Sequence, residues 1–175
     1  MDSNLFKAIL AMDSYNRGYG EGIKLSTVLN TTQLGNATIV SQSDIDPTHD
    51  AVNIGFYAIA YDTNNDGKAD IISYRGTDNV AQDSQTGWTL GGGLISSPQG
   101  KMAIQFYQAV AGEGHWLDAN ISLTGHSLGG GLAGYVGAIY DQDATIFDSM
   151  TFESAANNAY IAANGYNVTW VANIT

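Results

Sequence analysis

Apolar residues recur along the chain with two different periods, which predict alternating helices and strands. Helical spacing of apolar residues is found near the N-terminus, where Leu5, Ile9 and Leu10 share one face, and again from Gln99 to Val110. Two glycine- and alanine-rich stretches predict further helices at 128–140 and 155–163. Apolar runs rich in β-branched or aromatic residues predict short strands at 37–40, 53–61, 69–74, 120–123, 149–152 and 167–173.

Strands alternating with helices favour an α/β layered fold, in which helices flank a central, mostly parallel sheet. The 175 residues show no internal repeat and no linker, so a single domain over residues 1–175 is predicted. Polar residues and a glycine at 62–67 predict a tight hairpin between two of the strands. Residues 79–100 are rich in glycine and are predicted to form a long loop.

The charge of the chain limits its partners. Asp and Glu number 17 against 6 Lys and Arg, which gives a net charge of −11 and argues against a nucleic-acid partner. With no cysteine, disulfides, thiolate metal sites and cysteine nucleophiles are excluded. Charged residues make up only 13% of the chain, a composition typical of extracellular bacterial proteins, although the N-terminus lacks the features of a cleaved signal peptide. We therefore expect an extracellular location, with the cytoplasm as the alternative.

The sequence Gly-His-Ser-Leu-Gly at 125–129 matches the G-x-S-x-G pattern of a nucleophile elbow. It stands between a predicted strand and a predicted helix. A serine on such a sharp turn needs glycines two residues before and after it, because larger side chains would collide there. The helix that follows directs its positive end and a free backbone N–H toward the place where an oxyanion would form. An ordinary glycine-rich turn is the alternative.

A second motif, Tyr-Arg-Gly-Thr-Asp at 74–78, follows another predicted strand, where a second oxyanion donor would lie. Arg75 within it is expected to pair with a carboxylate and to anchor the turn. Together with Thr-Gly-His-Ser-Leu-Gly-Gly at 124–130, this motif resembles the lipase class 3 family, the fungal-type triacylglycerol lipases and their bacterial relatives. The similarity covers most of the chain. It implies an α/β-hydrolase fold, a triad of serine, aspartate and histidine, and a lid over an acyl pocket.

The resemblance assigns a role to each matching residue. Ser127 corresponds to the nucleophile, while Thr77 and the backbone N–H of Leu128 correspond to the oxyanion hole. The residues that support the elbow are Gly125, His126 and Gly129. His126 occupies the variable position of the elbow, so we expect it to pack beside the turn rather than to act as the base.

The sequence departs from the family at the other two triad positions. In this fold the acid and then the histidine follow the serine along the chain, yet no histidine follows Ser127. We expect the aspartate and histidine to come from a downstream segment or a second chain, which makes the sheet incomplete at its C-terminal side. An unusual arrangement with His49 or His115 as base is the alternative, and Asp141, Asp143 and Asp148 are expected to be solvated loop residues.

Two further segments carry candidate residues. Trp88, Leu90, Leu94 and Ile95 lie among glycines where the family carries its lid, and they fit either a mobile flap or a fixed loop. A weak calcium candidate is formed by four residues of the hairpin, for which a plain hairpin is the alternative: Asp62, Asn64, Asp66 and Asp70. Position twelve of a calcium loop would be Ser73 instead of glutamate. No cofactor and no other metal are predicted.

The sequence therefore predicts a carboxylic-ester hydrolase, a lipase or esterase, that acts on a lipid or small ester through an acyl-enzyme on Ser127. The alternatives are a phospholipase with the same machinery, a noncatalytic acyl-binding remnant, or one half of a split hydrolase. The isolated chain is expected to be weakly active or inactive, because its base and acid are not visible.

Overall fold

The computed structural model describes residues 3–17, 33–43, 50–77 and 80–164. Its strands are β1 (Gln33–Leu34), β2 (Ala37–Gln42), β3 (Ala58–Asp62), β4 (Ile71–Tyr74), β5 (Ser122–His126) and β6 (Ala144–Phe147). Its α-helices are α1 (Ser3–Asp13), α2 (Asp50–Asn53), α3 (Val80–Thr86), α4 (Pro98–Ala111), α5 (Leu128–Tyr140) and α6 (Glu153–Asn164). Two short 3₁₀ turns, Ser14–Asn16 and Trp88–Leu90, complete the secondary structure of these residues.

The six strands form one sheet in chain order, β1 to β6. The pairs from β1 to β4 are antiparallel, whereas β4, β5 and β6 are parallel. The α/β fold is thus confirmed, but the sheet is mixed where a mostly parallel one was predicted. The reason is the length of the connections: a tight hairpin joins β3 to β4, while α4 and α5 supply the crossovers that parallel strands need.

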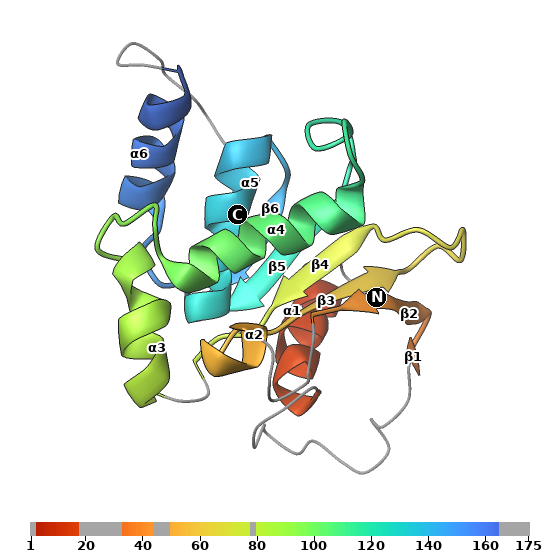
Figure 1. Cartoon of the computed structure of the whole chain (residues 1–175). Helices are drawn as coiled ribbons and strands as arrows, with labels where there is room; N and C mark the ends of the chain where they lie inside the picture. The colour runs from red at the N-terminus through yellow and green to blue at the C-terminus, as the bar shows by residue number, and fades with distance from the viewer. Residues whose placement is uncertain (1–2, 18–32, 44–49, 78–79, 165–175) are drawn as a thin grey trace.

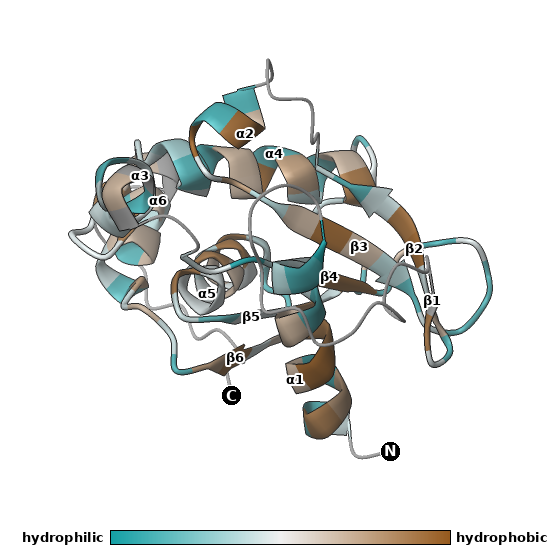
Figure 2. Ribbon diagram, turned by 90° about the horizontal axis from the view of Figure 1, so that it is seen from below, coloured by the Kyte–Doolittle hydropathy of each residue, from teal (hydrophilic) through white to brown (hydrophobic). Residues whose placement is uncertain are grey.

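Helices cover both faces of the sheet (Figure 1, Figure 2). On one face α1 packs against β4, β5 and β6, and on the other lie α4 and α5, with α6 packed against α5. Strand β3 is buried throughout and contributes to both sides, because Ala58 and Ala60 join one apolar cluster and Ile59 and Tyr61 the other. No helix of the described ranges is long and apolar enough to cross a membrane.

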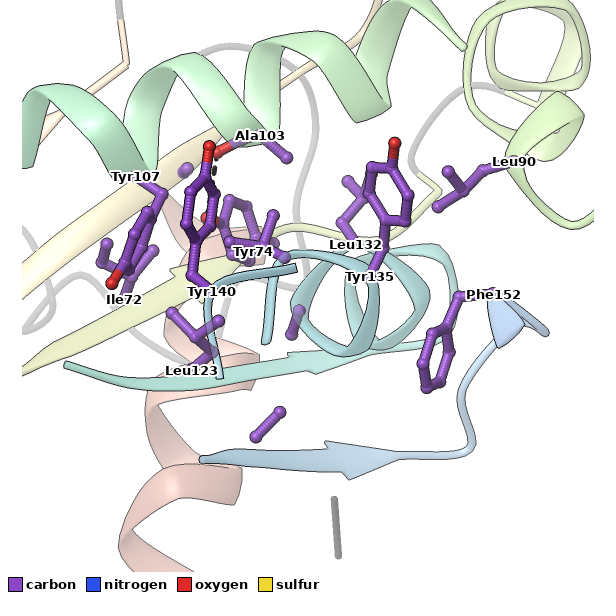
Figure 3. Packing of buried hydrophobic residues seen from close by; sticks show 14 of the residues in the cluster. Ile72, Tyr74, Leu90, Ala103, Tyr107, Leu123, Leu132, Tyr135, Tyr140 and Phe152 are labelled. Atoms are coloured by element: carbon purple, nitrogen blue, oxygen red, sulfur yellow. Dashed lines mark hydrogen bonds between the residues drawn. The ribbon is translucent and has the colours of Figure 1, made fainter. Parts of the chain in front are cut away.

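The larger apolar cluster lies between the sheet and helices α4, α5 and α6 (Figure 3). Tyr107 and Tyr140 stack in it with ring centroids 4.7 Å apart. Helix α5 is glycine-rich because it approaches its neighbours closely: a Cβ on Gly134 would lie 2.5 Å from the ring of Phe152. This confirms the prediction that residues 128–140 form a helix in close contact with its surroundings.

Three predicted segments differ in the structure. Residues 53–61 were predicted as one strand, but Gly55 has a positive φ of 79° and breaks the segment into the end of α2 and the start of β3. Of the predicted loop at 79–100, the described residues 80–100 are mainly helical. The strand predicted at 149–152 is wrong, since β6 ends at Phe147 and the following apolar side chains pack against the glycine face of α5. The strand predicted at 167–173 lies outside the described residues.

Candidate active site

Ser127 stands at the turn between β5 and α5, as predicted. Its backbone adopts φ 56° and ψ −124°, a conformation that a non-glycine residue rarely adopts. The Ser127 N–H donates to the Phe147 carbonyl at 3.0 Å, and the Ser127 carbonyl accepts from the Met150 N–H at 2.9 Å. The side chain does not cap α5, although it occupies the N-cap position. The turn is therefore held by its backbone, and the hydroxyl is not used to stabilise the helix.

The two glycines of the motif are required by the space around them. A Cβ on Gly125 would lie 2.8 Å from the Gly130 nitrogen and closer still to the Gly129 carbonyl group. A Cβ on Gly129 would lie 2.8 Å from the carbonyl carbons of Tyr74 and Arg75 and closer still to the Tyr74 oxygen. Real Cβ atoms do not approach backbone so closely. Since β4 ends at Tyr74, Gly129 brings the start of α5 directly against the end of that strand.

The second motif continues from β4 alongside the elbow. Tyr74 is in register with Gly125, so the residues after it run beside the residues after β5. A Cβ on Gly76 would collide with the Tyr15 hydroxyl and the His126 carbonyl. Thr77, the next residue, is partly buried, and its Oγ1 accepts a hydrogen bond from the Trp88 indole at 3.1 Å.

Leu128 begins α5 and is buried, at 1% exposure. Its side chain packs against the segment that carries Trp88, because a Cβ on Gly87 would lie 2.5 Å from the Leu128 Cδ2 atom. Backbone N–H groups in the first turn of a helix have no partner within the helix and lie at the positive end of its dipole. Leu128 follows Ser127 at the start of α5, and Thr77 follows the end of β4, the strand beside β5. Their role as donors to an oxyanion stays a prediction.

Arg75 anchors the turn after β4. It is 3% exposed, its guanidinium lies 5.0 Å from the centre of the Tyr57 ring, and its backbone N–H donates to the Tyr57 carbonyl at 3.0 Å. Burial raises the pKa of Tyr57 to about 12, although the positive charge of Arg75 opposes the shift. The cation over the ring holds the start of the 75–77 segment in place. The carboxylate partner expected for Arg75 stays a prediction.

The two histidines that the structure describes, His126 and His115, each contact another side chain. His126 contacts Tyr15 through Nδ1, 3.1 Å from the tyrosine hydroxyl, and the two rings meet edge to face. This agrees with the expectation that His126 packs beside the turn. His115 lies in the exposed loop before β5, at the opposite end of the strand from Ser127, and its Nδ1 is 3.5 Å from Asp118. The alternative with His115 as base is therefore wrong, while His49 lies outside the described residues.

The structure also describes three aspartates that follow Ser127 in the chain and one tyrosine that precedes it. Asp141, Asp143 and Asp148 are exposed, in agreement with their prediction as solvated loop residues. Tyr15 was missed by the sequence analysis, because it lies 111 residues from its partner His126 and no local pattern connects them.

The predicted lid residues fall into two groups. Leu90 is fully buried, whereas Trp88, Leu94 and Ile95 are 45%, 51% and 41% exposed. The Gln99 amide donates to the buried Asp83 carboxylate at 2.6 Å and thereby joins α3 to α4. Residues 83–99 thus form a hydrogen-bonded wall beside the elbow that carries the exposed apolar side chains. Whether this wall is a mobile flap or a fixed loop stays a prediction.

The predicted hairpin at 62–67 is confirmed by the antiparallel pairing of β3 with β4. Asp62 accepts hydrogen bonds from the backbone N–H groups of Asn64, Asn65 and Gly67. Burial disfavours the charged Asp62 carboxylate, but these hydrogen bonds together outweigh it and lower its pKa. Asn64, Asp66 and Asp70 likewise accept from backbone N–H groups of the loop. Ser73, the twelfth position of the calcium pattern, is buried in β4, and its hydroxyl donates to the Leu10 carbonyl. The calcium site stays a prediction.

A strained serine between a strand and a helix, at the carboxyl edge of parallel strands, is the geometry of a nucleophile elbow in an α/β fold. The chain matches a family model described as Phospholipase-like, a Tle-like phospholipase domain, over residues 7–173. It therefore belongs to this phospholipase-like family, which implies a hydrolase that acts on lipid. No curated protein and no solved structure matches the chain.

Proposed function

We propose that this protein hydrolyses the carboxylic-ester bond of phospholipids through an acyl-enzyme on Ser127. The observation that carries the proposal is the strained turn at Ser127, which leaves its hydroxyl outside the helix cap. A backbone held at such φ and ψ values is kept only where the surrounding structure enforces it, and residues of this kind concentrate at active sites. Membership of a phospholipase-like family favours a phospholipid over the triacylglycerol expected from lipase class 3.

The reaction would proceed in two steps. The Ser127 oxygen bonds to the ester carbonyl carbon while the carbonyl π electrons move to its oxygen, which becomes the oxyanion. The Thr77 hydroxyl and the Leu128 N–H would stabilise that charge. Collapse of the intermediate breaks the bond to the lysophospholipid, whose oxygen takes up the proton that Ser127 has lost. Water then adds to the acyl-enzyme, the fatty acid leaves, and the Ser127 oxygen regains a proton.

A general base is still required to take the proton of Ser127. His126 is turned to Tyr15 and His115 lies at the far end of β5. We therefore place the base and its acid partner outside the described residues, in a downstream segment or a second chain, with His49 as the alternative base. Because charged residues make up only 13% of the chain, we also propose a location outside the producing cell.

The test is hydrolysis of phosphatidylcholine vesicles by the full-length protein and by its Ser127→Ala variant. We expect lysophospholipid and free fatty acid, and a loss of at least about 10³-fold in the variant. Ser84→Ala is the matched control, because Ser84 is an exposed serine on α3. Release of diacylglycerol or phosphatidic acid would contradict cleavage at the carboxylic ester, and undiminished hydrolysis by Ser127→Ala would refute the assignment of the nucleophile.

A further inference from the structure

A hydrogen bond joins Trp88, in the wall beside the elbow, to Thr77, the proposed side-chain donor to the oxyanion. The Trp88 indole Nε1 lies 3.1 Å from Thr77 Oγ1, across 11 positions of sequence. An indole N–H can only donate, so the Thr77 hydroxyl accepts this bond. Within the ranges that the structure describes, the Thr77 hydroxyl proton has no acceptor of its own.

The direction of this bond suits an oxyanion donor. A threonine hydroxyl carries one proton and two lone pairs, and it rotates freely about its C–O bond unless a partner fixes it. When one lone pair accepts from Trp88, the proton must point elsewhere. A hydroxyl that already accepts a hydrogen bond is also polarised and becomes a better donor.

Trp88 is held firmly enough to orient its partner. It starts the 3₁₀ turn Trp88–Leu90, and Leu90 at the other end of this turn is fully buried. Figure 3 shows the Leu90 side chain directed toward Leu132 and Tyr135 of α5. Just before the turn, Gly87 packs against Leu128. The backbone on both sides of Trp88 is therefore packed against the same helix that begins at the elbow.

The segment that precedes Trp88 is equally constrained. The Thr86 hydroxyl donates to the Ile54 carbonyl at 2.7 Å, and the Ser97 hydroxyl donates to the Thr86 carbonyl at 2.9 Å. Gln99, buried at 1% exposure, donates to Asp83 and also to the Ile54 carbonyl. Because several hydrogen bonds hold this segment internally, we expect it to stay in place and not to open as a lid.

On the other side, Thr77 is tied to the elbow. Gly76 lies against Tyr15 and the His126 carbonyl so closely that no side chain fits there. Thr77 is thus held from two directions, by its own backbone on the elbow side and by Trp88 on the wall side.

We propose that Trp88 is a positioning residue, which orients the Thr77 hydroxyl so that its proton points to the oxyanion formed on the substrate. This inference rests on the proposed function. Preorganised donors stabilise a transition state because they need no reorientation when charge develops. Loss of the indole N–H would leave Thr77 in place but free to rotate, so it should lower kcat and leave KM unchanged.

The test compares Trp88→Phe, which removes the N–H and keeps an aromatic ring, with the unmodified full-length protein on phosphatidylcholine vesicles. We expect kcat to fall about 10-fold, against about 10²–10³-fold for Thr77→Val, which removes the whole donor. Trp116→Phe is the matched control: Trp116 is 37% exposed, close to the 45% of Trp88, and lies in the loop before β5. This control should keep its kcat.

The decisive readout is a double-mutant cycle. If Trp88 acts through Thr77, the Trp88→Phe substitution should have no further effect in the Thr77→Val background. An equal loss in both backgrounds, or a change confined to KM, would overturn the inference and indicate that Trp88 contacts the acyl chain. An increase in activity would also overturn it and indicate that Trp88 holds a lid closed. Hydrolysis that survives Ser127→Ala would overturn the proposed function as well, whereas a purely additive cycle with Ser127-dependent hydrolysis overturns only the role of Trp88.

Discussion

Replacement of Gly129 by alanine should damage both the fold and the site, because this glycine brings α5 against the end of β4. The new Cβ would lie 2.8 Å from the carbonyl carbons of Tyr74 and Arg75, where ordinary van der Waals contact begins at 3.4 Å. The two backbones must therefore move apart by at least about 0.6 Å, and no flexible side chain is present to absorb the shift.

The size of the effect follows from this geometry. Overpacking in a close-packed interior costs about 1–3 kcal/mol, and backbone contacts lie at the upper end of this range. Alanine gains about 1 kcal/mol over glycine as a helix residue, so we expect a net loss of about 2 kcal/mol in the free energy of unfolding. The displaced residues lead directly to Thr77. Since a misplacement of about 1 Å can lower a rate by about 10²-fold, we expect folded Gly129→Ala to lose between about 10- and 100-fold in kcat.

Urea unfolding measures the first effect, and hydrolysis of phosphatidylcholine vesicles per folded molecule measures the second. Gly92→Ala is the control, because a Cβ there would meet its nearest neighbour, the Thr89 carbonyl, at an ordinary 3.4 Å. It should change the free energy of unfolding by less than about 0.5 kcal/mol. The reasoning is refuted if Gly129→Ala unfolds at the same urea concentration as the unmodified protein and retains its rate.

Three further predictions concern charge and burial. Because the chain carries a net charge of −11, anionic vesicles should be hydrolysed more slowly than zwitterionic ones at low salt. The difference should shrink as added salt shortens the Debye length from about 30 to about 8 Å. Faster hydrolysis of anionic vesicles at low salt would contradict this prediction. Burial raises the pKa of Tyr57 and of Tyr107 to about 12, so the neutral phenols favour the fold, and the free energy of unfolding should fall as pH rises from about 10 toward about 12. A free energy of unfolding that stays constant over this range would count against it. Asp62→Ala leaves three backbone N–H groups of the hairpin without their acceptor, so it should lower the free energy of unfolding by about 1–2 kcal/mol. An unchanged midpoint of urea unfolding would contradict this prediction.

The sequence predicted best the features that depend on neighbouring residues. The turn at Ser127 and the close packing of α5 follow from the positions of glycines within a few residues, and both are confirmed. The hairpin at 62–67 likewise follows from the local hydrogen bonds of Asp62.

Features that depend on distant partners could not be predicted. Helix α3 has no apolar period, and its Asp83 is joined to Gln99 of α4 by a contact that no local pattern reveals. Tyr15 meets His126 only because α1 and its 3₁₀ extension pack against the sheet. The strand predicted at 149–152 failed because its apolar residues pack against the glycines of α5, whereas the strand pattern expects them to face a sheet.

The most direct test of the account is the site of covalent modification by an alkyl fluorophosphonate, which reacts with activated serines and leaves a tetrahedral phosphonyl group on the oxygen. The full-length protein would be treated, digested and examined by mass spectrometry. The account predicts a single adduct on the peptide that contains Ser127, formed in parallel with the loss of phospholipid hydrolysis and absent from the Ser127→Ala variant. Complete loss of hydrolysis with the adduct on a different serine would contradict it.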